Sequence, residues 1–153
     1  MHHDRVEIRI GEQGDLPRAR DAYELWGYDG GVQPSDCVFL AERGADLVGV
    51  VRLTEEEGVK MLRGMQIAPQ ERRRGTGTRL LHALVSRLGD SMCYCVPFAH
   101  LVGFYGQVGF EEIRLNDAPA FLVERIARYR GEGHVVTLMR RPAQTDSRSR
   151  RPI

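Results

Sequence analysis

The stretch Met61–Leu88 constrains the fold more than any other part of this 153-residue chain. It predicts an apolar strand, a basic turn that contains glycines and an amphipathic helix in direct succession. The turn, Arg72–Gly77, therefore leads into the N-terminus of a helix. The apolar residues of that helix recur at the spacing of one helical face, at Leu80, Leu81, Leu84, Val85 and Leu88.

A helix N-terminus behind such a turn is a candidate anion site. The first N–H groups of a helix lack partners within it and carry the positive end of the helix dipole. Gly75 and Gly77 let the main chain approach a phosphate closely, and the arginines at 72–74 add charges that pair with phosphate oxygens. The alternative interpretation is a solvated charge run beside an ordinary helix start.

Two other phosphate-binding motifs fit the turn less well. A P-loop requires Lys followed by Ser or Thr after its last glycine, whereas the only lysine of this chain, Lys60, precedes the turn. A dinucleotide fingerprint requires a third glycine where this chain has Leu80, and a longer chain for its sheet and substrate domain. The remaining pattern is Arg-x-x-Gly-x-Gly between a strand and a helix.

A second motif follows 30 residues after Gly75, where Phe104-Tyr105 precedes Gly109-Phe110. The two motifs in this order resemble the GNAT superfamily of acyl-CoA-dependent N-acyltransferases, over about residues 5–141. The resemblance implies a mixed α/β (α+β) GNAT fold. Its central sheet would be mostly antiparallel, with about six to seven strands, splayed between the fourth and fifth strands and flanked by helices. It also implies a single N-acetyltransferase domain at residues 1–141.

Apolar periodicity and turn residues predict the individual elements. The helix at 119–129 departs from the simplest GNAT layout, where a hairpin is usual. It is a candidate for core packing, for the acceptor side or for contact in a homodimer. Residues 142–153 lack apolar periodicity, and we expect them to be disordered. The predicted strands are 6–10, 37–43, 47–53, 60–68, 92–96, 110–115 and 134–139, with an acidic turn at 54–58, and a further helix is 15–26. The resemblance implies a short helix within 100–107, which is too short to be judged by periodicity alone.

Composition narrows the class of protein. With 42% hydrophobic and 28% charged residues, the chain can bury a core of ordinary domain size. A net charge of +1 argues against broad nucleic-acid binding. No apolar run reaches the length of a membrane span, about 18 residues, and no secretory h-region follows the start, so we expect a cytoplasmic protein. Three cysteines indicate reduced thiols, and no histidines and carboxylates have metal-ligand spacing, so we expect no metal.

The resemblance implies which residues bind acetyl-CoA, the expected co-substrate. The strand before the turn would pair through its main chain with the pantetheine arm. A main-chain N–H near Gln66 or Ile67 would polarise the thioester carbonyl. The turn and the helix start would hold the pyrophosphate. The implied cofactor-binding residues are Met65, Gln66, Ile67, Arg72, Arg73, Arg74, Gly75, Thr76, Gly77, Thr78 and Phe104.

Tyr105 matches the family position that gives a proton to the departing thiolate. A tyrosine phenol has a reference pKa of about 10 and carries its proton at neutral pH. The alternatives are that Tyr105 only hydrogen-bonds the thioester sulfur or packs. The general base is not identified, because Cys93 occupies the strand position where family members often place a Glu. An acyl-cysteine route through Cys93 or Cys95 is the less favoured alternative, since buried Cys usually behaves as a small hydrophobe. Cys93 is also a weak candidate for the acceptor site.

The expected function is transfer of acetyl to a primary amine, by direct attack in a ternary complex. A small molecule or amino acid is the first expectation for the acceptor, and a protein or peptide amine is the second. A non-catalytic acyl-CoA-binding module stays open, because the splayed strands lack a carboxylate. The loop 27–36 borders the acceptor in the family pattern, which makes Trp26, Tyr28 and Asp29 acceptor candidates. The alternative is a surface loop whose aromatic residues cap the core.

Overall fold

The structure is a computed structural model that describes residues 5–144. The chain folds into two compact units. Unit 1 runs to Glu55 and includes Leu62–Arg87, and unit 2 comprises Glu56–Met61 and the chain from Leu88 onward. Each unit therefore combines segments that are distant in the sequence.

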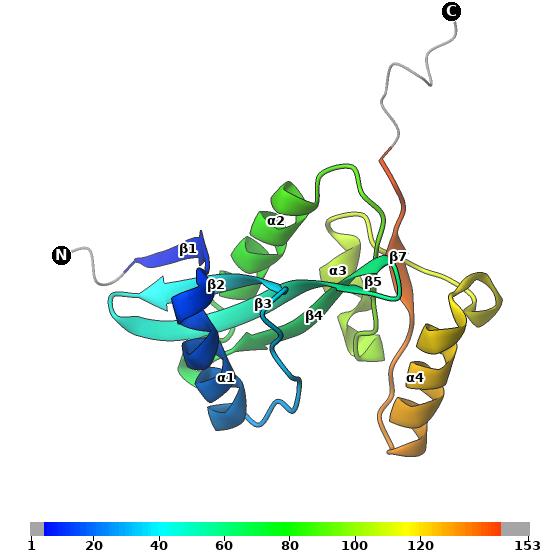
Figure 1. The fold of residues 1–153 in the computed structure, drawn as a ribbon, viewed down its shortest axis with the longest axis horizontal. Helices are drawn as coiled ribbons and strands as arrows, with labels where there is room; N and C mark the ends of the chain where they lie inside the picture. Colours follow the sequence, from blue (N-terminus) through cyan, green and yellow to red (C-terminus); the bar gives the residue numbers. More distant parts are fainter. Residues whose placement is uncertain (1–4, 145–153) are drawn as a thin grey trace, which may run out of the picture. The chain divides into compact units, whose positions relative to one another are not determined.

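Seven strands form one sheet in the order β1-β2-β3-β4-β5-β7-β6 (Figure 1). The pairs β1–β2, β2–β3, β5–β7 and β6–β7 are antiparallel, whereas β4–β5 is parallel and short, with the single pair Met61–Tyr94. The predicted fold class, including the splay between the fourth and fifth strands, is confirmed. The elements are β1 Val6–Ile10, α1 Leu16–Leu25, β2 Cys37–Arg43, β3 Asp46–Glu56, β4 Val59–Ile67, α2 Thr76–Leu88, β5 Cys93–Cys95, α3 Val102–Gly106, β6 Glu111–Glu112, α4 Ala120–Gly131 and β7 Met139–Arg141.

Unit 1 is a sheet with a helix on each face, α1 on one and α2 on the other (Figure 1). Because side chains alternate along a strand, Leu40 and its partner Val50 pack against α1, in a core cluster with Leu16, Ala19 and Tyr23. The neighbouring pair Ala41–Gly49 faces the other way. A Cβ on Gly49 would lie 2.9 Å from Leu80 Cδ1, so a glycine is needed there for α2 to pack this closely.

Unit 2 has its own core, built around α4 and the strands β5 and β7. Tyr94 of β5 and Met61 contact Leu122 and Ile126, two buried residues on one face of α4. The core-packing interpretation of the helix at 119–129 therefore holds for this face. Val136 and Leu138, which precede β7, complete the cluster.

Three predicted elements were wrong in extent, among them the strand predicted at 110–115, of which only Glu111–Glu112 forms a strand. The acidic turn at 54–58 is shorter, because β3 continues to Glu56 and only Glu57 and Gly58 turn, with φ values of 51° and 80°. The strand predicted at 134–139 begins only at Met139. Val136 forms an isolated bridge with Phe98, and Thr137 N donates to Pro97 O at 3.0 Å. The apolar run there reflects burial in the core, which an irregular segment also satisfies.

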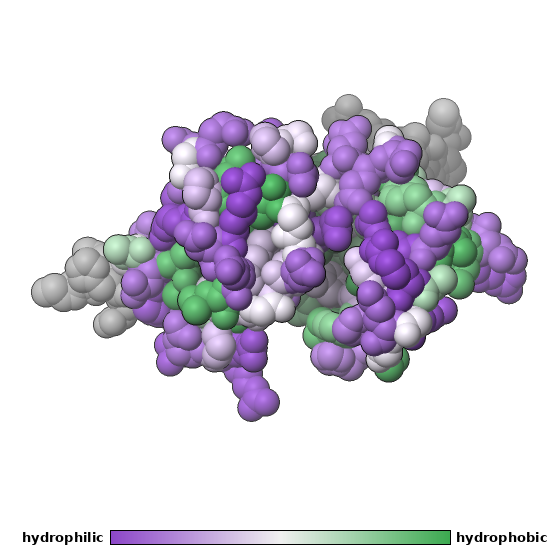
Figure 2. Space-filling model, turned by 60° about the horizontal axis from the view of Figure 1, so that its bottom comes forward, coloured by the Kyte–Doolittle hydropathy of each residue, from purple (hydrophilic) through white to green (hydrophobic). Residues whose placement is uncertain are grey.

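The face shown in Figure 2 is mostly hydrophilic, and its hydrophobic residues gather in patches separated by hydrophilic ones. Between residues 5 and 144, no helix combines the length and apolar character that crossing a bilayer requires. Residues 145–153, most of the tail predicted to be disordered, lie outside the described residues.

Candidate functional site

The turn between β4 and α2 has the main-chain shape of an anion-binding nest. Arg73 has a φ of 65° and Gly75 a φ of 82°, both in the left-handed region. Left-handed residues within a turn can direct successive N–H groups toward one concave side. A Cβ on Gly75 would meet nothing within 4 Å, so space lies open beside this residue. The arginines at 72–74 are exposed, as binding of a large anion requires.

The helix α2 starts directly from this turn at Thr76. Its first helical hydrogen bond runs from Arg79 N to Gly75 O, at 3.1 Å, so the N–H groups of residues 76–78 lie outside the helical ladder. Leu80, Leu81 and Leu84 are fully buried, which fixes the helix against the sheet. The positive end of the helix is therefore held at the turn.

A buried carboxylate, Glu71, anchors the base of the turn. It is 2% exposed and binds the Arg43 guanidinium through both oxygens, at 2.7 Å from Nη2 and 3.2 Å from Nε. Thr76 Oγ1, at the helix start, donates to Glu71 Oε1 at 3.4 Å. The hydrogen bond from Arg43 holds the pKa of Glu71 below its usual range. A carboxylate with a lowered pKa is a poor general base, so Glu71 holds the turn in place.

Replacing Glu71 with glutamine should lower the free energy of unfolding by about 2 kcal/mol at pH 7. Breaking a fully buried pair costs more, but Arg43 is 26% exposed and partly screened by solvent. Because the folded-state pKa lies below the unfolded value, this stability is present above a pH of about 4.3. It is lost as the pH falls through the folded pKa. Urea unfolding should show the gap between wild type and variant narrowing below pH 4.

The exposed Glu55 offers the matched control for that measurement. Glu55→Gln also removes one carboxylate from the same unit, but no buried partner depends on it. Its unfolding free energy should stay within about 0.5 kcal/mol of wild type at pH 7 and below pH 4. An equal loss in the two variants would mean that the Arg43 pair does not stabilise the turn.

The end of β4 leads into the turn. Met65, Gln66 and Ile67 are half-buried, and Arg72 Nε donates to Ile67 O at 3.3 Å. Just before them, Gly64 has a φ of 67° inside the strand. Its carbonyl accepts a hydrogen bond of 2.8 Å from the Tyr23 hydroxyl of α1. Burial raises the pKa of Tyr23, so this phenol stays protonated and keeps donating.

The motif tyrosine lies in unit 2, on the short helix α3. Tyr105 is 5% exposed. Its ring meets the Phe104 ring edge-on at 4.9 Å and the Phe110 ring at 6.1 Å. Phe110 N also donates to Tyr105 O at 3.4 Å. Phe104 and Phe110, one from each half of the motif, therefore pack against the Tyr105 ring and hold it in place.

The weaker acceptor candidates have different surroundings. Trp26 and Tyr28 pack against the unit 1 core cluster, and Asp29 is exposed. Cys93 of β5, in unit 2, is fully buried and its Sγ lies 3.6 Å from Tyr94 O. Burial also raises the pKa of the neighbouring Cys95 thiol well above its ordinary value. A buried thiol held protonated is a weak nucleophile, which disfavours an acyl-cysteine route through Cys95.

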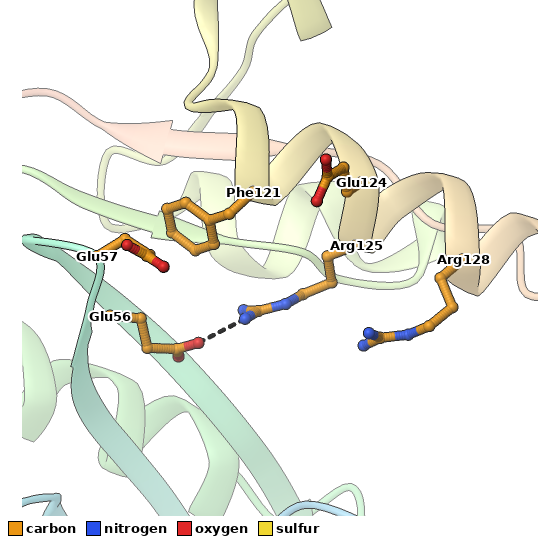
Figure 3. A pocket seen from close by; sticks show the side chains of 6 residues that line it. All are labelled: Glu56, Glu57, Phe121, Glu124, Arg125 and Arg128. Carbon is orange, nitrogen blue, oxygen red and sulfur yellow. Dashed lines mark hydrogen bonds and ion pairs between the residues drawn. The ribbon is translucent and has the colours of Figure 1, made fainter.

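A cavity of about 570 Å³ opens in unit 2 between the β3–β4 turn and α4 (Figure 3). Arg125 crosses it, with Nη2 at 2.5 Å from Glu56 Oε1 and the guanidinium over the Phe121 ring. Of the three acidic residues 55–57 in the predicted acidic turn, Glu55 and Glu57 are exposed, and Glu56 forms this ion pair with Arg125. In residues 5–144, no three His, Cys, Asp or Glu side chains gather to hold a metal ion.

Several structural residues of the site were missed by sequence reasoning. Glu71 and Arg43 come from separate segments, and only the acidic residue directly before the arginine run could have drawn attention. A third residue that was missed is Arg52 of β3, which is 1% exposed and lies in an apolar strand with no motif around it. Its burial results from the tertiary fold, so the sequence alone does not reveal it. Within unit 1, the structure brings Gly64 of β4 together with Tyr23, Arg52 and the loop before β2. The base of the turn is tied instead to Arg43, at the other end of β2.

The comparisons with known proteins give a family match over the centre of the chain. A family model described as "Acetyltransferase (GNAT) domain" matches residues 34–112, just over half of the chain. This range includes both the turn 72–77 and Tyr105. No curated protein matched the chain by sequence.

Solved structures with the same fold cover nearly the whole chain. An N-acetylglutamate synthase from Neisseria gonorrhoeae, complexed with coenzyme A and N-acetyl-glutamate, is 19% identical with a TM-score of 0.66. The alignment covers 92% of this chain but only 36% of the synthase. The ribosomal-protein-S18-alanine N-acetyltransferase from Escherichia coli is 18% identical with a TM-score of 0.65. There the alignment covers 93% of this chain and 96% of the other. At these identities the likeness concerns the fold alone.

Proposed function

The chain belongs to the GNAT acetyltransferase family, and from that premise we propose that it acetylates the primary amine of a small molecule or amino acid in a ternary complex. As a member of that family it is an acyl-CoA-dependent N-acetyltransferase. The observation that carries the proposal is the anion-binding turn 72–78, with left-handed Arg73 and Gly75 in front of an anchored helix N-terminus.

The residues present fit acetyl-CoA. The N–H groups of residues 76–78, the nest and the exposed arginines at 72–74 would hold the pyrophosphate, because phosphate oxygens accept from main-chain and guanidinium donors alike. The half-buried Met65–Ile67 would line the pantetheine arm, with Phe104 as a further contact. Acetyl-CoA supplies the activated acetyl group.

Tyr105 would supply the proton that the departing thiolate needs. Its ring is fixed by Phe104 and Phe110, so the hydroxyl is held in one place. A positioned acid typically contributes a factor of about 100 to 10,000 in rate. A neutral amine must attack, and β4 has no carboxylate to accept its proton. We propose that the amine arrives neutral or loses its proton through water.

Release of free thiol from acetyl-CoA across a panel of primary amines tests this function. The panel contains amino acids, small amines and short peptides with free N-termini. Thiol release that depends on an amino acid or small amine supports the proposal. Release only with peptides would favour a protein or peptide acetyltransferase, for which the length match with the Escherichia coli enzyme is the supporting observation. Stabilisation by CoA without thiol release from any amine would favour a non-catalytic acyl-CoA-binding module.

A further inference from the structure

Arg52 of β3 is a fully buried guanidinium in unit 1, 1% exposed. Its Nη1 donates to Gly31 O at 2.7 Å and to Asp36 Oδ2 at 2.8 Å, both from the loop before β2. The guanidinium carbon lies 5.4 Å from the centre of the Tyr23 ring. Arg52 therefore holds the loop with only one of its three nitrogens.

The other two nitrogens, Nε and Nη2, are shielded from solvent and have no hydrogen-bond partner in the described part of the chain. Buried donors are rarely left without a partner, because each loses its hydrogen bonds to water without replacement. Nε and Nη2 also share one edge of the guanidinium. Two parallel donors on one edge match the two oxygens of a carboxylate. The unpaired edge of Arg52 thus has the donor arrangement that a carboxylate group accepts.

This edge lies against the main chain of β4 at Gly64. A Cβ on Gly64 would stand 3.3 Å from Arg52 Nε and 2.3 Å from Tyr23 Oη, so no larger residue fits there without displacing them. The next three residues of the strand, 65–67, are those proposed to line the pantetheine arm. A group held by Arg52 would therefore lie beside the strand that is proposed to bind the pantetheine arm of acetyl-CoA.

Tyr28 is a half-exposed side chain that packs beside Tyr23. Its ring lies 4.7 Å from the Tyr23 ring, and the loop around it is rich in glycine. A Cβ on Gly30 would lie 2.2 Å from the Tyr28 ring. The ring can therefore occupy this position only because residue 30 is a glycine. Rotation of one side chain is fast compared with catalysis. Because Tyr28 is half-exposed, rotation of this side chain does not require the loop to unfold.

We propose that the acceptor is an amine that carries a carboxylate, an α-amino acid, and that Nε and Nη2 of Arg52 bind that carboxylate after Tyr28 moves aside. The role of this amino acid as the acetyl acceptor rests on the proposed function. The ion pair of Arg52 with Asp36 is already neutral, so a lone anion would add net negative charge. A zwitterion brings its own ammonium group and keeps the site neutral.

Matched pairs of acceptors test the proposal on the full-length protein. Each L-amino acid of a panel is compared with its α-carboxamide, which keeps the amine and loses the carboxylate charge. Thiol release should give a kcat/KM at least about 100-fold higher for the preferred acid than for its amide, since a site built to bind a polar group rejects analogues that lack it. In thermal-shift measurements without acyl-CoA, the acid should raise the melting temperature of the protein and its amide should not.

Arg52→Lys keeps the positive charge but removes the two-donor edge. It should lower the ratio of acid to amide to below about 5, while the KM for acetyl-CoA stays within about twofold. Arg18→Lys is the matched control, because Arg18 binds Glu42 on the surface of the same unit. It should leave the ratio unchanged.

A wild-type ratio near 1, or a ratio that survives Arg52→Lys, overturns the proposal. If Arg52→Lys does not fold, the wild-type ratio decides alone. Stabilisation by acids but not amides, with no thiol release from any amine, supports the carboxylate site and overturns the transfer activity. Equal thiol release from acids and amides supports the transfer activity and overturns the carboxylate site. Stabilisation by inorganic phosphate but by no amino acid also overturns the proposal.

Discussion

Replacing Tyr105 with phenylalanine should lower the turnover number about 100-fold and leave the dissociation constant for acetyl-CoA within about twofold of wild type. The hydroxyl would act only when the thiolate leaves, so its loss raises the barrier to transfer and spares the binding of the donor. Phenylalanine keeps the ring contacts with Phe104 and Phe110, so the fold of α3 should survive. Steady-state kinetics and calorimetric titration with acetyl-CoA measure the two quantities separately.

Tyr129→Phe provides the matched control for this change. Tyr129 belongs to α4 in the same unit and packs at the edge of its core cluster. Removal of its hydroxyl should leave turnover and donor binding unchanged. If Tyr105→Phe keeps the wild-type turnover number, Tyr105 is not the acid and only packs.

Reversing the charge of Arg73 should raise the dissociation constant for CoA about 50-fold. A hydrogen bond to a charged group contributes about 1.5–3 kcal/mol, and Glu adds repulsion toward the pyrophosphate. Arg73 is exposed and has a φ of 65°. Glutamate bears the same left-handed strain as arginine, so stability should change by less than about 0.5 kcal/mol. Calorimetric titration with CoA and urea unfolding give the two values.

Two further variants separate charge from main-chain shape. Arg73→Gly should weaken CoA binding only about tenfold, since the nest remains, and should raise the unfolding free energy by about 0.5–1 kcal/mol by relieving the strain. Arg114→Glu makes the same change of net charge at an exposed position of unit 2 and should leave CoA affinity unaltered. Equal affinities for Arg73→Glu and wild type would contradict the assignment of the turn to the pyrophosphate.

Most elements could be predicted from local pattern. The hairpin strands 37–43 and 47–53, the helix ending at Leu88 and the strand 6–10 lie where apolar spacing and turn residues placed them. Prediction failed at 134–139, where an apolar run is buried but irregular, and at 54–58, where β3 continues through an acidic sequence. In both places cross-strand pairing and burial decide the conformation, and neither is visible in a local window.

The sequence by itself determined the strand-turn-helix unit that makes residues 72–77 a candidate anion site, because its arginines, glycines and helix start are contiguous and act through local geometry. It also supplied the second family motif, Phe104-Tyr105 before Gly109-Phe110, through motif order and spacing. Only the tertiary structure decided the surroundings of Arg52. Asp36, Gly31, Tyr23 and Gly64 come from segments far apart in the chain and meet through strand pairing and the packing of α1. Whether a charge is buried, and which of its donors lack partners, depends on that packing, so no local pattern in an apolar strand reveals it.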